Sequence, residues 1–314
     1  MKYLINTCTD PHWNMAFDAF ALEGLRVDEP VFYLWQNAPA VIIGRNQSAY
    51  AEVNLPFLEA QGIILARRVT GGGAVYHDLG NLNYSIVGPT KSLEQHYGTV
   101  AAALREMGVP AEQSGRNDIL VEGRKCSGYA KRLSKDRMMI HGTLMWDVDL
   151  VQLTQALSVP GSKLESKGIA SVRSRVANLK DFLPQFGSIN AFRSAMQDLL
   201  AGADERIDLT QKELDSIDRL AGDKFSSWDW VYGQSPQTAF RKTQKFPCGT
   251  VTAHYSLHGG RLNQLSFTGD FLGAKPAEEL AGALQGKKLE EIRNVDIGLY
   301  FDGLTAEELL SLFQ

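Results

Sequence analysis

The chain has 314 residues, 44% hydrophobic and 22% charged, and a formal net charge of −4. This composition is typical of a globular protein with room for one large and one small domain. The negative net charge argues against a protein that wraps nucleic acid, and no apolar run approaches the roughly 20 residues that cross a membrane. Three widely spaced cysteines and no apolar signal segment at the N-terminus lead us to expect a cytoplasmic protein.

Helices and strands are expected to alternate through the first third of the chain. A helix should follow Thr9-Asp10-Pro11, because an acidic N-cap precedes a proline there. Helices are also expected at 49–61 and 92–107. Short strands rich in β-branched and aromatic residues are expected at 31–35, 41–43, 62–66 and 82–87.

Further helices and strands are expected up to about residue 221, and a separate group of elements begins near residue 247. Further strands are expected at 118–121 and 138–145, and further helices near 149–157, 189–201 and 210–221. A hairpin is expected at 250–267, covered by helices near 276–285 and 305–313. We therefore predict an α/β (α+β) protein. A large domain with mixed β-sheets flanked by helices should span 1–243, and a small α+β domain 247–314.

Two arginines, Arg67 and Arg68, precede three consecutive glycines, Gly71 to Gly73. Consecutive glycines free the backbone to expose several N–H groups along one concave side. Beside arginines that keep their charge at neutral pH, such a loop suits a phosphate or an adenylate. The alternative is a glycine hairpin turn with two solvated arginines.

A second candidate region, residues 115–137, holds seven basic and three acidic residues. Lys125 and Cys126 are followed by Ser127-Gly128-Tyr129-Ala130, small or apolar residues that are typical of a packed site. A lysine near a phosphate neutralises developing negative charge. Asp118, which follows Asn117, is a candidate Mg²⁺ ligand. The alternatives are a solvated basic hairpin for the region and a turn residue for Asp118.

A third region, residues 163–180, carries five basic residues and one acidic residue and has the composition of a loop. It could close over a polyphosphate, receive an acidic partner protein, or remain solvated. His141 lies inside an apolar strand, where a hydrogen-bonded core residue is the expected role. The chain contains no Walker-type phosphate loop, so an ordinary P-loop nucleotide hydrolase is not expected.

In their order and spacing, these segments resemble the lipoate–protein ligase A family of the biotin/lipoate protein ligase superfamily. The matching strings are Arg67-Arg68-x-x-Gly71-Gly72-Gly73-Ala74-Val75-Tyr76-His77-Asp78, Gly115-Arg116-Asn117-Asp118, Lys125-x-Ser127-Gly128, His141-Gly142-Thr143-Leu144 and Ser166-Lys167-Gly168-x-x-Ser171-Val172-x-Ser174-Arg175-Val176. The likeness covers nearly the whole chain, and the tail resembles that family's small C-terminal domain.

The resemblance implies an enzyme that works in two steps. Lipoate and ATP, with Mg²⁺, would give lipoyl-AMP and pyrophosphate. A lysine of an acceptor protein would then take the lipoyl group. The implied acceptors are lipoyl domains of E2 subunits of 2-oxoacid dehydrogenases and the glycine-cleavage H protein, and we expect the enzyme itself to be a monomer.

The resemblance also implies roles for individual residues. Lys125 would bridge the acyl carbonyl and the phosphate as an electrostatic catalyst. The implied nucleotide contacts are Arg68, Gly73, Ala74, Val75, Tyr76, Asn117, Asp118 and Lys125, with Asp118 also the Mg²⁺ ligand. The implied lipoate contacts are Arg68, Gly72, Gly73, His77, Lys125, Gly128 and His141. Further candidates are Arg132, Lys167, Arg173 and Arg175, the last three in a loop that is a candidate lid.

Two positions depart from the family pattern. Ile140 stands where many relatives have a second histidine before His141, and Cys126 stands where an apolar residue is common. Related octanoyltransferases use a cysteine nucleophile, so an ATP-independent acyl transfer through Cys126 stays open, although a free cysteine often behaves as a small buried hydrophobe. A lipoate-binding module without turnover is the other alternative. The sequence does not decide between lipoate and octanoate.

Overall fold

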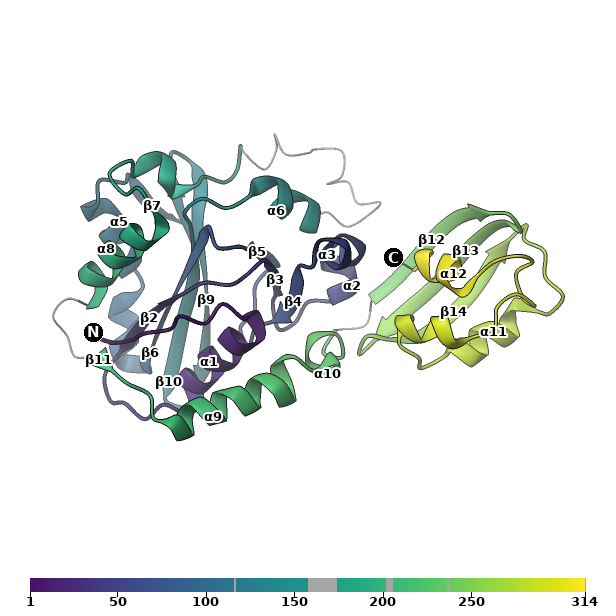
Figure 1. The fold of residues 1–314 in the computed structure, drawn as a ribbon, viewed down its shortest axis with the longest axis horizontal. Coiled ribbons are helices and arrows are strands. Elements are labelled where there is room, and N and C mark those ends of the chain that lie inside the picture. Colours follow the sequence, from purple (N-terminus) through teal and green to yellow (C-terminus); the bar gives the residue numbers. More distant parts are fainter. Residues whose placement is uncertain (116, 158–173, 202–205, 236–237, 314) are drawn as a thin grey trace.

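The computed structural model describes residues 1–115, 117–157, 174–201, 206–235 and 238–313. Figure 1 shows a large N-terminal part and a smaller C-terminal part that has its own sheet. Two candidate residues, Lys167 and Arg173, lie outside the described residues. In the described part of the chain, no helix has the length and apolar character needed to span a membrane.

An eight-stranded mixed sheet forms the centre of the large part, with the strand order β11-β1-β2-β6-β10-β9-β8-β7. The strands are β1 (Lys2–Leu4), β2 (Val31–Trp35), β6 (Asn81–Pro89), β7 (Ala111–Ser114), β8 (Asp118–Val121), β9 (Arg124–Ser134), β10 (Arg137–Met145) and β11 (Arg206–Ile207). β1 is parallel to both of its neighbours, whereas β6 is antiparallel to both β2 and β10. The expected mixed sheet is confirmed.

A second, three-stranded sheet carries the glycine loop. β3 (Ala40–Ile43) lies between β4 (Ile64–Arg67), which is parallel to it, and β5 (Val75–His77), which is antiparallel. The loop 68–74 therefore connects the two outer strands of this sheet. β4 starts two residues later than expected, because Gly62 adopts a left-handed φ of 63° and caps the preceding helix.

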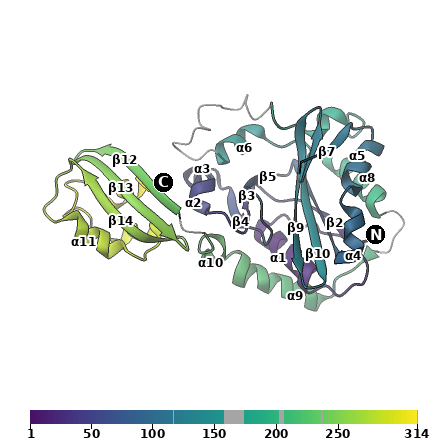
Figure 2. The same ribbon diagram turned by 180° about the vertical axis from the view of Figure 1, so that it is seen from behind.

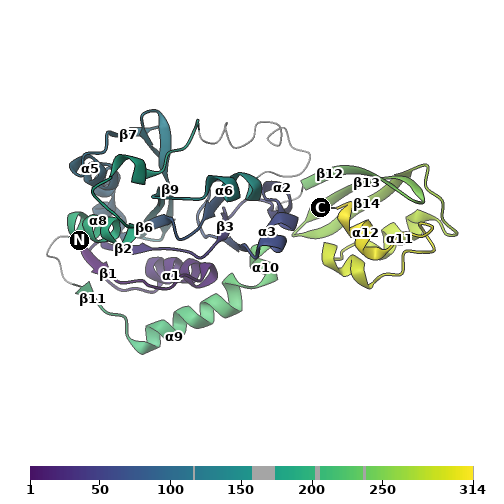
Figure 3. The same cartoon turned by 45° about the horizontal axis from the view of Figure 1, so that its top comes forward.

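Helices cover both faces of the large sheet. α1 (Pro11–Glu23) begins where expected, because the Asp10 side chain accepts from the Trp13 N–H and Pro11 occupies the first helical position. Figure 3 shows α1 beside α9 (Gln211–Leu220) on one face, and α5 (Thr99–Glu106) beside α8 (Ile189–Ala201) on the other. The remaining elements of this part are α2 (Ala49–Glu52), α3 (Leu55–Gln61), α4 (Thr90–Leu93), η1 (Glu94–His96), α6 (Leu150–Ala156), η2 (Leu179–Phe182), η3 (Ala221–Phe225) and α10 (Trp228–Val231).

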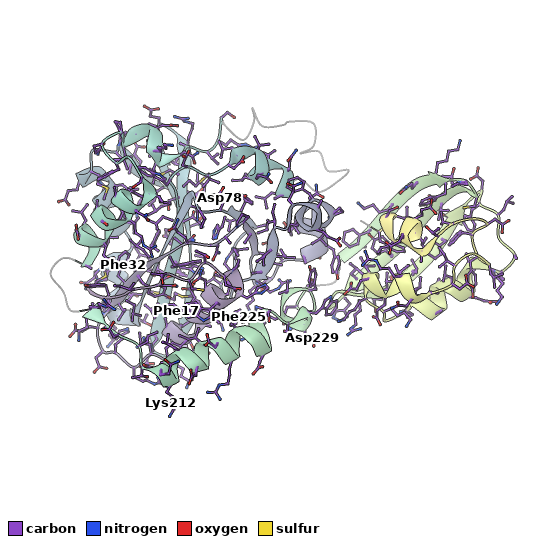
Figure 4. The ribbon with its side chains drawn as sticks, in the orientation of Figure 1. Phe17, Phe32, Asp78, Lys212, Phe225 and Asp229 are labelled. Carbon is purple, nitrogen blue, oxygen red and sulfur yellow. The ribbon has the colours of Figure 1, made fainter. Side chains whose placement is uncertain are left out.

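The alternation of side chains along β2 divides the interior into two hydrophobic cores. Val31, Tyr33 and Trp35 face the α1 side, and Phe32 faces the side of α5 and α8. Figure 4 labels Phe17 of α1, which joins the first core together with Phe225, and Phe32, which belongs to the second. The site described below lies on the α1 side.

Two expected helices are each divided by a local break. The expected helix at 49–61 forms α2 and α3, because Val53 is extended and Asn54 caps the second helix. The expected helix at 92–107 forms α4, η1 and α5, with Gly98 immediately before α5. Apolar periodicity predicted that these segments are helical but did not locate the interruptions.

The C-terminal part is an antiparallel sheet of β12 (Thr238–Phe246), β13 (Gly249–His258) and β14 (Arg261–Gly269). It packs in one core with α11 (Ala277–Leu284), η4 (Leu289–Asn294) and α12 (Ala306–Ser311). Figure 2 shows this sheet from behind, with α11 beside it. The hairpin and its covering helices were expected, but β12 was not. The split into 1–243 and 247–314 stays a prediction, and β12, which pairs with β13, begins before residue 243.

Candidate active site

A cavity of about 170 Å³ lies between the two sheets of the large part. Its walls come from the glycine loop and β5, from β6, β9 and β10 of the large sheet, and from single residues of α1, β2 and β3. Every residue that the sequence implied for lipoate contact lines it: Arg68, Gly72, Gly73, His77, Lys125, Gly128 and His141. Of the expected nucleotide contacts, Ala74, Val75 and Asn117 line it as well.

The other described candidates lie outside this lining. Tyr76 is 5% exposed and packs into the α1-side core, because alternate residues of β5 face opposite ways. Asp118 reaches the site through its contact with Lys125. Arg132 donates from Nη1 to the Val69 carbonyl at 2.7 Å, within the glycine loop and two residues before its first glycine.

Arg68 organises the glycine loop from within. Its Nη2 donates to the carbonyls of Gly71 (2.7 Å) and Gly73 (2.8 Å), and its Nε donates to Thr70 Oγ1 (3.1 Å). Burial lowers the pKa of Arg68 to about 10, so the guanidinium stays charged at neutral pH. Arg68 therefore fixes the shape of the loop and also places a permanent positive charge in the cavity wall.

Arg67, the preceding residue, has a different role from the one its position suggested. It is fully buried and is not part of the cavity lining. Its guanidinium donates to backbone carbonyls on either side, at Gly44, Arg45, Gln47, Trp230 and Val231. The hypothesis of two arginines beside an anion is therefore wrong for Arg67, because alternate residues of a strand point in opposite directions.

Lys125 lies at the open end of the cavity. Its Nζ is 2.8 Å from Asp118 Oδ1, and the two side chains are 41% and 36% exposed. A Cβ on Gly128 would come within 2.7 Å of this Nζ, so the absence of a side chain at Gly128 makes room for the lysine. The backbone N–H of Lys125 also donates to the Arg175 carbonyl at 2.8 Å, so this part of the third basic region lies directly beside the lysine.

A network of hydrogen-bonded, buried polar side chains adjoins the cavity and was not predicted from the sequence. Asp18 Oδ2 lies 2.6 Å from His141 Nδ1, and His141 Nε2 lies 2.7 Å from Thr70 Oγ1, which also accepts from Arg68. Tyr33 and Ser85 donate their hydroxyl groups to Asp18 Oδ1 at 2.5 and 2.8 Å. His141 is thus the hydrogen-bonded buried residue that was expected, and it connects α1 to the glycine loop. The sequence signal that could have identified Asp18 is its position, as an acidic residue on the apolar face of the helix expected after Pro11.

Cys126 is buried and faces the other core. It is 0% exposed, its Sγ lies 3.4 Å from the Ile119 carbonyl, and it packs among the residues on the α5 and α8 side of the sheet. Burial raises the pKa of its thiol to about 12. Because the thiolate is the nucleophilic form of cysteine, this environment does not favour catalysis by Cys126.

Comparison with known proteins defines the class. Residues 10–201 match the family described as lipoyl protein ligase A/B catalytic domain, and residues 235–313 match the bacterial lipoate protein ligase C-terminus. The chain belongs to the lipoyl protein ligase A/B family, as the sequence resemblance predicted.

Individual relatives narrow the comparison. The chain is 36% identical to the lipoate-protein ligase LplJ of Bacillus subtilis, over 96% of each chain. It is also 36% identical to lipoate–protein ligase 1 of Staphylococcus aureus, over 99% of each chain.

Solved structures agree with the fold. A bipartite lipoate protein ligase from Thermoplasma acidophilum, from a structural study with its E2 lipoyl domain, matches with a TM-score of 0.67 and 31% identity, covering 74% of this chain and 96% of that one. A lipoate-protein ligase A bound with ATP matches with a TM-score of 0.65 and 30% identity, covering 74% of this chain and 98% of that one. The predicted fold class is confirmed.

Proposed function

We propose that the protein is an ATP-dependent lipoate–protein ligase. One observation carries the proposal: a single cavity is lined by a half-exposed lysine, by the glycine loop and by buried apolar side chains such as Met15 and Trp35. Such a cavity suits a small acid whose carboxylate reacts at the open end while its hydrocarbon body is buried. The relatives named lipoate-protein ligase and the ATP-bound neighbour support this assignment.

In the first step a carboxylate oxygen of lipoate attacks the α-phosphorus of ATP. A new O–P bond forms, the bond to the bridging oxygen breaks, and pyrophosphate leaves with the electron pair. Lys125 stabilises the negative charge that grows on the phosphate and carbonyl oxygens, and Arg68 adds a second fixed positive charge. The expected nucleotide contacts at Gly73, Ala74, Val75, Tyr76 and Asn117 stay part of this proposal.

In the second step the amine of an acceptor lysine attacks the carbonyl carbon of lipoyl-AMP. A C–N bond forms, the C–O bond to the phosphate breaks, and AMP leaves as the amine loses a proton. The proposed acceptors are lipoyl domains of E2 subunits and the glycine-cleavage H protein. The nearby position of Arg175 makes the third basic region a candidate for contact with the acceptor. A monomeric enzyme and a cytoplasmic location stay predictions.

Magnesium fits the open end of the cavity. The ion prefers one or two carboxylates together with substrate phosphates, and Asp118 supplies a carboxylate beside Lys125. No group of three or more His, Cys, Asp or Glu side chains suited to a metal occurs among the described residues, so the phosphates would provide the other ligands. Bound there, Mg²⁺ would neutralise phosphate charge.

The deciding experiment is mass spectrometry of a lipoyl domain incubated with the enzyme and lipoate. A mass increase of one lipoyl group that requires ATP supports the ligase. An increase that needs an acylated carrier protein in place of free acid and ATP supports the transferase. Lipoate binding without any product supports a binding module.

A Cys126→Ser variant separates the ligase from the transferase. We expect its ATP-dependent lipoylation to stay within about twofold of the wild-type rate, because the thiol is buried and protonated. The rate of lipoyl-domain modification gives the measurement. Loss of activity in a variant that keeps its melting temperature would contradict this and restore the nucleophile hypothesis.

A Gly44→Ala variant tests the shape of the glycine loop. A Cβ at Gly44 would overlap the carbonyl oxygen of Gly72, so the loop must move. We expect the KM for ATP to rise about tenfold or more, since small displacements of positioning groups are costly.

The matched control is Gly71→Ala in the same loop, where a Cβ meets no atom within 4 Å. Its effect on the KM for ATP should be clearly smaller. Equal effects in a steady-state pyrophosphate assay would show that the contact between Gly44 and Gly72 is unimportant.

A further inference from the structure

Two buried polar side chains of the cavity lining, His77 and Asn83, lie beside Trp35: Asn83 is its partner in the neighbouring strand, and the rings of Trp35 and His77 are 6.1 Å apart. They are 3% and 1% exposed, whereas the Lys125 side chain is 41% exposed. In the described part of the chain, neither His77 Nε2 nor Asn83 Nδ2 has a hydrogen-bond partner. Buried polar atoms are normally paired, so these two call for a functional explanation.

The chain itself fixes the proton on His77. Asn14 Nδ2 donates to the Gln36 carbonyl (2.9 Å) and to Asn37 Oδ1 (2.8 Å), so the amide nitrogen of Asn37 faces His77. This nitrogen lies 3.0 Å from His77 Nδ1, which must therefore accept, and the proton must lie on Nε2. Burial lowers the pKa of His77 to about 3, so the ring is neutral at physiological pH.

Asn83 presents a donor too. Its Oδ1 accepts from Asn81 Nδ2 at 2.8 Å, which leaves the amide nitrogen as the unpaired group. This part of the cavity thus offers N–H donors from two side chains. A ligand pairs with them only if it carries hydrogen-bond acceptors there. A straight alkyl chain has none, and it would cover these donors and leave them unpaired, at a cost in affinity.

We infer that His77 and Asn83 select acids whose far end carries hydrogen-bond acceptors, such as the two sulfur atoms of a cyclic disulfide, over plain alkyl acids of the same length. The inference rests on the proposed function and names its substrate preference: lipoate over octanoate. Sulfur accepts hydrogen bonds weakly, so the expected preference is about tenfold, not the much larger factors seen with hydroxyl groups.

The test is calorimetric binding of two ligands to the full-length protein. One is lipoate, and the other is its carbocyclic analogue, in which two CH₂ groups replace the sulfur atoms. The ring size and chain length are matched, so the affinity ratio reports the acceptors. We expect lipoate to bind about tenfold more tightly. Equal affinities, or no binding of either acid, would overturn the inference.

Two variants assign the preference to the donors. Asn83→Leu and His77→Phe keep approximate size and remove the N–H groups, and each should bring the affinity ratio toward one. Asn54→Leu, which removes a helix cap outside the cavity, should leave the ratio unchanged. A general loss of stability lowers both affinities together, so an unchanged ratio in both cavity variants would overturn the inference.

ATP-dependent pyrophosphate release, measured in parallel, separates this inference from the proposed function. A lipoate preference without turnover would retain the selectivity and reject the ligase. ATP-dependent lipoylation with equal binding of the two acids would retain the ligase and reject the selectivity.

Discussion

Replacing Lys125 by alanine should lower the rate of lipoate adenylation about 10²–10³-fold, the usual effect of removing one donor that stabilises transition-state charge. The fold should survive, because the only charge partner recorded for Lys125 in the described residues is Asp118 and both side chains are partly exposed. Ion pairs of this kind contribute about 0–1 kcal/mol to the free energy of unfolding. The measurement is single-turnover formation of pyrophosphate, with the melting temperature recorded on the same sample.

Lys180→Ala is the matched control for this variant. Lys180 Nζ lies 2.6 Å from Asp147 Oδ2, the two side chains are 52% and 51% exposed, and neither residue lines the cavity. The adenylation rate of the Lys180→Ala variant should match that of the wild type. Lys125→Arg keeps the charge but spreads it over a planar group, so it should recover only part of the activity. Wild-type adenylation in Lys125→Ala would remove this lysine from the mechanism.

The sequence predicted the fold best where local signals and burial agree. β2 and α8 occupy the expected residues, because each has a strong apolar pattern bounded by polar or turn residues. β12 was missed because it is rich in lysine, arginine and threonine, and because it lies at the edge of its sheet and pairs only with β13. An edge strand can carry such residues and still pair through its backbone.

The candidate site was predictable only where its residues are consecutive in the chain. The glycine loop and the segment around Lys125 form strings that can be read directly. Asp18 and Asn83 could not be found in this way, because they reach the site from α1 and β6 and their partners are far away in sequence. Their role depends on tertiary packing, which no local pattern encodes.

Arg67 shows that a residue inside such a string can still lie outside the site, since its neighbour Arg68 lines the cavity and Arg67 does not. Arg67→Met should lower the free energy of unfolding of the large part by about 3–5 kcal/mol, because several buried carbonyls lose their charged donor at once. At roughly 2–4 °C per kcal/mol for a domain of this size, the melting temperature should fall by about 6–20 °C. Calorimetry of the full-length protein measures this directly.

Two substitutions show whether the loss comes from the hydrogen bonds or from the charge. Arg67→Lys keeps the charge, but one ammonium cannot reach the acceptors on both sides, so we expect only partial recovery. Arg45→Met removes an exposed arginine of the same neighbourhood and should change the melting temperature little.

The Arg67 bonds join the loop after β3 to the carbonyls of Trp230 and Val231 in α10, the last helix before the C-terminal sheet. Arg67 therefore holds α10, at the end of the large part, against the loop after β3. An Arg67→Met protein that melts like the wild type but no longer binds ATP would instead return this arginine to the nucleotide site.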